Sequence, residues 1–257
     1  MFSTRVKLAT WNVNSIRARL DHLLDWLARR QPDVLCLQET KVVDELFPVA
    51  ALTDVGYSAA YFGERTYNGV AILSREPLTE VQCSYPLAEN TDCRVIAGTL
   101  RGLRIYCAYF PHGRDPLGPT FLPKLAWIEG LGDLIFNDSS PLIVMGDFNV
   151  AYDPRDVFDP VAVEGTIHFT PEERAALQRM LDRGLVDAFR LRHEEGGQYT
   201  WWDYRQGSFR RNLGWRIDHA FVTADLAERV VDAYIDRDER AKPQASDHVP
   251  LVVELDS

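Results

Sequence analysis

The chain has 257 residues, of which 46% are hydrophobic and 26% charged, and its formal net charge at pH 7 is −10. This composition is typical of a folded globular protein and excludes a disordered or low-complexity chain. No apolar run approaches the roughly 18 residues of a membrane-spanning helix, so we expect no membrane association. Residues 1–7 lack the pattern of a secretory signal peptide, which predicts a cytoplasmic protein.

The first third of the chain predicts a strand, a helix and two further strands. Apolar residues between Ile16 and Leu27 recur at helical spacing, with Asn14 or Ser15 at the position of a helix N-cap. Short runs rich in β-branched residues predict buried strands at residues 6–11, 34–37 and 70–73. Cys36, in the second of these runs, is predicted to be a buried free thiol, as is Cys107 further along.

The rest of the chain predicts more strands and two more helices. A helix is expected from about residue 124 to residue 136. The clearest helix start follows Thr170, where Pro171 stands at the first helical position and Glu173 completes a capping box. Gly184 is expected to end that helix. Buried strands are predicted at residues 95–100, 104–110, 142–145, 216–222, 230–235 and 251–255.

The order of these elements indicates the fold class and the number of domains. Many strands with few helices favour packed sheets covered by helices, an α/β sandwich, over a doubly wound sheet. We find no internal repeat and no linker composition, so residues 1–257 are predicted to form a single domain.

Polar residues follow several of the predicted strands, at the points where a core opens to a site. Any one of them alone is more often a turn former or a surface carboxylate. The hypothesis of a site therefore rests on the whole set, which comprises Asn12, Asn14, Glu39, Asp147, Asn149, Asp218, Asp247 and His248.

Together these residues suit the hydrolysis of a phosphate ester. Glu39 and nearby amide oxygens are hard ligands that fit Mg²⁺ better than zinc. Asp147 and Asn149 are two residues apart, so on an extended segment both would face one side and hold a water molecule. His248 offers a positive charge to a phosphate, and Asp218 is suited to fix its tautomer.

The segments that hold these residues resemble the exonuclease III family of abasic-site (AP) DNA endonucleases, within the endonuclease/exonuclease/phosphatase superfamily. The resemblance covers nearly the whole chain. It rests on eight segments in the family's order: Ala9-Thr10-Trp11-Asn12-Val13-Asn14, Leu37-Gln38-Glu39-Thr40-Lys41, Tyr109-Phe110-Pro111, Gly146-Asp147-Phe148-Asn149, residues 184–190, residues 200–205, residues 213–218 and Ser246-Asp247-His248.

The resemblance implies a four-layer sandwich, in which two mixed β-sheets pack face to face and helices flank them. It implies that Glu39 is the principal metal ligand, with Asn12 and Asp247 close to the metal, and that the cofactor is Mg²⁺, for which Mn²⁺ can substitute. Asn14 departs from the Asp of many relatives, which is expected to weaken metal affinity modestly. The catalytic residues implied are Tyr109, Asp147, Asn149, Asp218 and His248.

The net negative charge argues against a polyanionic partner, but the local distribution of charge argues for one. Residues 204–217 carry four arginines and no acidic residue among several aromatic side chains, a combination that suits phosphate contact and base stacking. The resemblance implies that Trp201, Trp215 and Ile217 line a pocket for a flipped-out abasic sugar. The predicted DNA contacts are Arg17, Lys41, Tyr67, Asn68, Arg205, Arg210 and Arg211.

The sequence therefore predicts a monomeric, Mg²⁺-dependent DNA repair enzyme that cuts 5′ to abasic sites and also has 3′–5′ exonuclease or 3′-end-cleaning activity. Its partner is double-stranded DNA with abasic sites or blocked 3′ ends, which would associate it with a bacterial nucleoid. Three alternatives stay open: mainly a 3′-phosphatase or 3′-exonuclease, a phosphatase of small molecules or lipids, and a non-catalytic nucleic-acid-binding regulator. His168, in a loop that would influence this balance, is interpreted as a surface residue.

Overall fold

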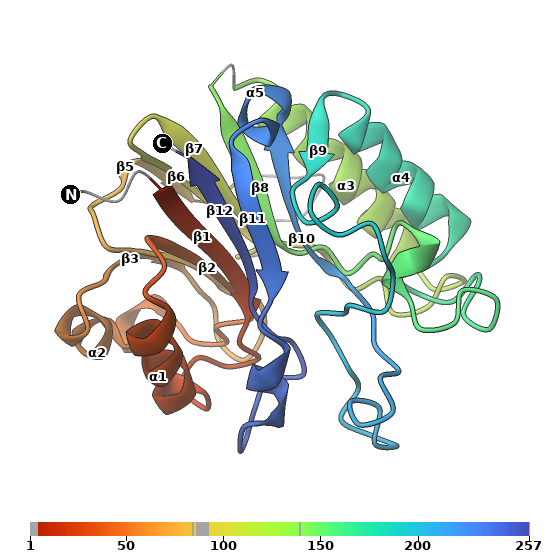
Figure 1. Cartoon of the computed structure of the whole chain (residues 1–257), viewed down its shortest axis with the longest axis horizontal. Helices are drawn as coiled ribbons and strands as arrows, with labels where there is room; N and C mark the ends of the chain where they lie inside the picture. The colour runs from red at the N-terminus through yellow and green to blue at the C-terminus, as the bar shows by residue number, and fades with distance from the viewer. Residues whose placement is uncertain (1–4, 84, 86–92, 139, 257) are drawn as a thin grey trace.

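The computed structural model describes residues 5–83, 85, 93–138 and 140–256, which form two six-stranded β-sheets packed face to face (Figure 1). The first sheet has the order β11 (Val230–Ile235), β12 (Leu251–Asp256), β1 (Arg5–Asn12), β2 (Val34–Gln38), β4 (Val70–Ser74), β3 (Ser58–Phe62). The second has the order β5 (Thr79–Cys83), β6 (Val95–Leu100), β7 (Leu103–Tyr109), β8 (Leu142–Asp147), β10 (Asp218–Thr223), β9 (Leu185–Asp187).

Helices cover the outer face of each sheet. On one side of Figure 1 lie α1 (Leu20–Arg30) and α2 (Val49–Asp54), and on the other lie α3 (Phe121–Ile135) and α4 (Pro171–Leu181). The short helix α5 (Ala224–Ala227) follows β10. The predicted four-layer α/β sandwich is confirmed. No helix in the described part of the chain is both long and apolar enough to cross a membrane.

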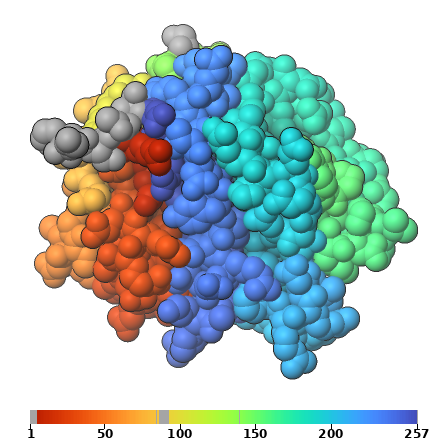
Figure 2. All heavy atoms as spheres, viewed as in Figure 1, coloured from red at the N-terminus to blue at the C-terminus, as the bar shows by residue number. Residues whose placement is uncertain are grey.

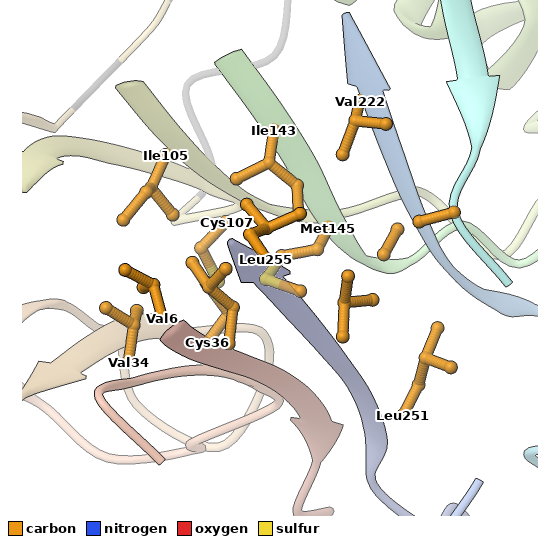
Figure 3. Close-up of a cluster of buried hydrophobic side chains, with 14 of the residues drawn as sticks. Val6, Val34, Cys36, Ile105, Cys107, Ile143, Met145, Val222, Leu251 and Leu255 are labelled. Carbon is orange, nitrogen blue, oxygen red and sulfur yellow. The ribbon is translucent and has the colours of Figure 1, made fainter. Parts of the chain in front are cut away.

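The core between the sheets is built from alternate residues of the central strands (Figure 3). Val34 and Cys36 of β2 face Ile105 and Cys107 of β7, and all four side chains are fully buried. The intervening residues pack against the helices instead, so both faces of these strands are buried. Such strands read as continuous apolar runs, and this is why their positions could be predicted. The predicted free, buried thiols of Cys36 and Cys107 are confirmed.

Elements with little apolar character were missed or misplaced. The edge strands β3, β5 and β9 were not predicted, because their residues are partly exposed or the strand is very short. The proposed cap at Asn14 or Ser15 is wrong, since α1 begins only at Leu20. Instead the Ser15 and Ile16 amides donate to the carbonyls of Glu39 and Thr40, which ties this segment to the loop after β2. Helix α3 begins three residues earlier than predicted.

The capping box of α4 is confirmed and fixes the start of that helix. The Thr170 hydroxyl accepts a hydrogen bond from the Glu173 amide at 3.1 Å, and the Glu173 carboxylate accepts one from the Thr170 amide at 3.1 Å. Gly184 follows the helix with a φ of +121°, a conformation that favours glycine.

The strand directions bring the polar strand ends to one edge of the sandwich. Strands β1 and β2 are parallel, as are β7 and β8, so their carboxyl ends point the same way. Strand β10 runs antiparallel to β8 and begins at that edge, with Asp218 opposite Asp147. The chain termini lie near the other end of the sandwich in Figure 1.

Candidate active site

The strand-end residues of both sheets meet at this edge. Asn12 ends β1 in the first sheet, and Asp147 ends β8 in the second. The Asn12 amide nitrogen donates to Asp147 Oδ2 at 2.9 Å and to Glu39 Oε1 at 2.8 Å. One amide group thus joins a carboxylate from each sheet. Its own oxygen faces away from the carboxylates and accepts a hydrogen bond from the Asn14 amide at 3.0 Å.

His248 is held on the opposite side of Asp147. Its Nδ1 donates to Asp218 Oδ2 at 2.8 Å, and its Nε2 lies 3.8 Å from Asp147 Oδ2. The backbone of His248 is fixed as well, because its amide donates to Ser246 Oγ and its carbonyl accepts from Trp11 Nε1. The imidazole therefore has one orientation, with Nδ1 on Asp218 and Nε2 toward Asp147.

Burial and neighbouring charges shift the pKa values of this cluster strongly. Burial alone would lower the pKa of His248, but the Asp218 and Asp147 carboxylates outweigh it and raise it to about 10. Burial raises the pKa of Asp147 to about 7; the His248 charge opposes this rise, and the Asp218 and Glu39 charges add to it. Burial also disfavours the Glu39 carboxylate, yet Lys41 and Asn12 hold its pKa below the usual range. At neutral pH His248 is charged.

The cluster fits a divalent cation. Carboxylate oxygens of Glu39 and Asp147 and a ring nitrogen of His248 lie within 4.8 Å of one another, although the charged His248 ring has no lone pair free to bind a cation. Two of the three donors are carboxylates, and the Asp218 carboxylate lies behind His248, so a cation would offset crowded negative charge. Lys41 Nζ lies 2.7 Å from Glu39 Oε2 and partly neutralises it.

Asp247 lies in a neighbouring network rather than in this group of three. Its Oδ1 accepts from Asn14 Nδ2 at 3.0 Å, and its Oδ2 accepts from Trp201 Nε1 at 2.9 Å. Asn14 Oδ1 in turn accepts from Lys41 Nζ at 2.6 Å. An amide at position 14 suits both neighbours, because an Asp would accept from Lys41 but would repel Asp247. These two contacts account for the Asn at position 14, where the sequence departs from the Asp of many relatives.

Asn149 lies beside Asp147, but not for the reason that its spacing suggested. The segment is not extended there, because Asn149 adopts a left-handed φ of +51°. Its backbone amide donates to Asp147 Oδ1 at 2.9 Å, and its side-chain amide donates to the Phe110 carbonyl at 3.0 Å. A tight turn therefore holds Asn149 against both Asp147 and the segment after β7.

Tyr109, the last residue of β7, is buried at the same edge. Burial raises the pKa of its phenol well above the usual value, and the Glu39 and Asp147 charges add to the effect. The Arg94 guanidinium lies 4.7 Å from the centre of its ring. Arg94 had not been singled out from the sequence, because neither a strand end nor a basic run marks it.

The aromatic residues predicted to form a pocket come together. Trp201, Trp215 and Ile217 pack on one cluster, and backbone bridges join Trp201 to Trp215 and to His248. The indole of Trp201 is hydrogen bonded to Asp247, so the aromatic cluster directly adjoins the polar one.

The interpretation of His168 as a surface residue is wrong. The side chain is only 8% exposed, and its Nδ1 donates to the Asn149 carbonyl at 2.6 Å. Its ring centre lies 6.1 Å from that of Trp215 and 4.4 Å from that of His112. Burial, together with the nearby Lys124 charge, lowers the pKa of His168 well below the usual value, so the ring is neutral.

The basic segment is only partly a surface. Arg205, Arg210 and Arg211 are exposed on residues 203–212, which project from the lower edge in Figure 2. Arg216 is fully buried instead and donates to Asp156 and Asp187, so it cannot contact a partner. Trp202 is likewise a core residue.

The other predicted DNA contacts lie around the loops after β2 and β3. Arg17 and Tyr67 are exposed, and the Lys41 amide donates to the Asn68 carbonyl at 3.0 Å. Arg17 and Lys41 line a pocket of about 500 Å³ together with Arg65, which had not been singled out from the sequence.

Comparison with known proteins gives one consistent result. The chain matches the Endonuclease/Exonuclease/phosphatase family over residues 9–248. It is 35% identical to the exodeoxyribonuclease III of Haemophilus influenzae, over 97% of this chain and 100% of that protein. It superimposes with a TM-score of 0.95 on an AP endonuclease from Archaeoglobus fulgidus (37% identity) and on a 3′-phosphatase from Neisseria bound to product DNA hairpin (39% identity), each over 98% of this chain and 100% of that chain.

Proposed function

The chain belongs to the endonuclease/exonuclease/phosphatase family, and we propose that it is a DNA repair phosphodiesterase that cuts the backbone 5′ to abasic sites and also processes 3′ ends. At a coarser level, it is a hydrolytic nuclease of the exonuclease III and AP endonuclease type that acts on DNA, and its cluster of acidic side chains suits a divalent metal. The observation that carries the proposal is the Asp147 carboxylate in contact with Asn12 and His248, while the Trp201–Trp215 cluster is hydrogen bonded to Asp247, the residue before His248.

The proposed chemistry is the attack of a water molecule on a phosphodiester, in which the P–O3′ bond breaks. The O3′ oxygen leaves and takes up a proton to become the 3′-hydroxyl, which balances the proton that the water loses. Asp147 takes the proton of the water, and a pKa of about 7 suits a general base at neutral pH. His248, charged and aimed by Asp218, places a positive Nε2–H where negative charge develops on the phosphate. Tyr109 and Asn149 are proposed to contact the phosphate. Asn12 keeps the Asp147 and Glu39 carboxylates in fixed positions relative to each other through its two hydrogen bonds.

We propose Mg²⁺ as the metal, with Mn²⁺ as a substitute, and Glu39 as its principal ligand. Carboxylate oxygens are the ligands that both ions favour. When bound, the cation would neutralise charge on the phosphate. Asn12 and Asp247 are proposed to support the metal site through their hydrogen bonds to Glu39 and Asn14.

Removal of the metal is expected to abolish cleavage, because Glu39, Asp147 and Asp218 would otherwise repel the phosphate. EDTA should stop cleavage of labelled DNA, and an excess of Mg²⁺ or Mn²⁺ should restore it. Independently of activity, Mg²⁺ should raise the melting temperature of the wild type, because a ligand that binds only the folded state stabilises it. Glu39→Gln should lose most of this increase. A melting temperature that rises equally in both proteins would contradict Glu39 as the principal ligand.

The DNA contacts proposed are Arg17, Lys41, Tyr67, Asn68, Arg205, Arg210 and Arg211, with Trp201, Trp215 and Ile217 as the pocket for an abasic sugar. We further propose that the protein acts as a monomeric single domain in the cytoplasm, where it is associated with the nucleoid through its substrate. Intact Glu39, Asp147, Asp218 and His248 argue against a non-catalytic regulator, and the exposed arginines argue against a small-molecule or lipid phosphatase.

One observation favours a second function, mainly 3′-phosphatase or 3′-exonuclease activity. The neutral ring of His168 lies beside Trp215 and is fixed by its hydrogen bond to the Asn149 carbonyl. A side chain at this place narrows the space for a flipped-out sugar, whereas a phosphate at a 3′ end reaches the cluster without entering the pocket. His168 thus favours 3′ ends over internal abasic sites.

Cleavage of three labelled duplexes tests both functions. They carry one internal abasic analogue, a nick with a 3′-phosphate, or no lesion. Mg²⁺-dependent incision at the abasic position supports the first function, and removal of the 3′-phosphate alone supports the second. His168→Ala is the matched variant: if His168 narrows the pocket, abasic incision should rise relative to 3′-phosphate removal. If neither lesion is processed, both functions are wrong.

A further inference from the structure

Lys124 of α3 is a fully buried lysine outside the proposed catalytic cluster. Its ammonium group donates to the Asn149 carbonyl at 2.7 Å, to the His112 carbonyl at 3.2 Å and to the Glu173 carboxylate. All three protons of the ammonium group therefore have an acceptor, and one acceptor is charged. Burying a lysine costs several kcal/mol before these contacts offset it, so the position of Lys124 requires an explanation.

The two carbonyls belong to the two loops that leave the second sheet at the candidate site. His112 follows Tyr109 at the end of β7, and Asn149 follows Asp147 at the end of β8. Asn149 has a left-handed φ of +51°, which disfavours the observed turn unless neighbouring contacts hold it. The Asn149 amide is bonded to Asp147 Oδ1 on one side, and its carbonyl is bonded to Lys124 on the other. Lys124 is thus linked to Asp147 by hydrogen bonds through one intervening residue, Asn149.

Glu173 is itself rigidly held. It is the capping-box residue of α4, and its Oε2 accepts hydrogen bonds from both the amide and the hydroxyl of Thr170. Its other oxygen faces Lys124. The helix start therefore fixes the carboxylate, the carboxylate fixes the ammonium group, and the ammonium group fixes both loop carbonyls.

We propose that Lys124, held by Glu173, is a positioning residue that sets the places of Asp147 and Tyr109 for the reaction. The inference rests on the proposed function of this site. Burial alone gives no reason for an ion pair here, because well-packed apolar residues of similar volume are often at least as stable as a buried ion pair. The two carbonyl hydrogen bonds are what an apolar residue would not supply.

Three variants separate positioning from stability. Lys124→Met removes the donor and leaves the Glu173 charge unpaired. Glu173→Gln keeps the capping box, which accepts either residue, and leaves Lys124 to hold the carbonyls. The double variant Lys124→Met with Glu173→Gln keeps the cap, buries no unpaired charge and lacks the donor. The matched control is Arg179→Met with Glu129→Gln, which removes an exposed ion pair between the same two helices.

The measurements are kcat and KM on the abasic and 3′-phosphate duplexes, the melting temperature, and DNA affinity in EDTA. Both variants without Lys124 should lose about 100-fold in kcat with KM and DNA affinity nearly unchanged, since small misplacements of a reacting group cost rates of this order. The surface control should keep kcat within about threefold, and Glu173→Gln, which loosens the hold on Lys124, should fall between this control and the variants without Lys124. The melting temperature should fall most in Lys124→Met and recover in the double variant.

Recovery of kcat along with melting temperature in the double variant would overturn the inference, because Lys124 would then matter only for stability. A loss of DNA affinity in EDTA, with kcat preserved, would also overturn it. A wild type that cleaves neither duplex would instead overturn the proposed function, and the positioning role would fall with it. Failure of the positioning role of Lys124 and failure of the proposed function therefore give different results.

Discussion

Replacing Asp147 by Asn is expected to reduce DNA cleavage by several orders of magnitude and to leave the fold intact. The amide has the same shape but cannot accept a proton, and loss of a general base alone costs about 10²–10⁴ in rate. In addition, Asn12 donates a hydrogen bond to Asp147 Oδ2, so an NH₂ group in the place of this oxygen would face another donor and the bond would be lost. Single-turnover cleavage of the abasic duplex, beside circular dichroism, measures the effect.

The stability of this variant serves as its control. Burial raises the pKa of Asp147 to about 7 from an ordinary value near 3.8, so folding favours the protonated carboxyl. The wild type in EDTA is therefore expected to lose stability as the pH rises from about 4 to about 7, and Asp147→Asn should lose less. Near-normal cleavage by a well-folded Asp147→Asn protein would rule out the proposed role of Asp147.

Replacing Asp218 by Asn is expected to lower kcat by about 10³-fold or more and to move the alkaline limit of activity. The Asp218 carboxylate makes the largest contribution to the raised pKa of His248 and accepts the proton of its Nδ1. An amide removes the charge and no longer fixes the ring in one tautomer, a change that can cost about 10⁴ where a histidine depends on its carboxylate partner. The pKa of His248 would therefore fall.

The pH profile of kcat distinguishes this effect from simple misfolding. In the wild type, His248 is charged below its pKa of about 10, so activity should decline only as the pH rises through that value. In Asp218→Asn the decline should begin at a lower pH, because the Asp147 and Asp247 charges then oppose the effect of burial without the larger contribution of Asp218. His219→Gln is the control, since this buried neighbour bonds the Val150 carbonyl and has a pKa lowered by burial to about 4. If the alkaline limit of activity is the same in Asp218→Asn as in the wild type, the proposed pairing of Asp218 with His248 is wrong.

Much of the architecture and of the polar cluster could be predicted from the sequence, because both follow local patterns. The central strands are buried on both faces and read as apolar runs. The capping box of α4 depends on contacts within one helical turn. Parallel neighbouring strands bring their carboxyl ends to one edge of each sheet, and the face-to-face packing of the two sheets then brings Glu39 and Asp147 together.

Only the tertiary structure decided which basic residues face outward. Arg216 looked like its exposed neighbours in a basic segment, but its partners Asp156 and Asp187 lie 60 and 29 residues away. No local pattern encodes such a pairing. For the same reason, a net charge of −10 did not settle the question of a DNA partner, since affinity depends on where the charges lie and not on their sum.

The sequence by itself determined which polar residues stand at the ends of strands and where those strands lie in the chain. The tertiary structure alone decided their surroundings: His168 is buried beside Trp215, Asn149 turns back on Asp147, and Lys124 holds the loops behind both. The turn at Asn149 is local, but the contacts of His168 and Lys124 join segments far apart in the chain. The burial and hydrogen bonding of such side chains are properties of the packed molecule, and no window of sequence contains both partners.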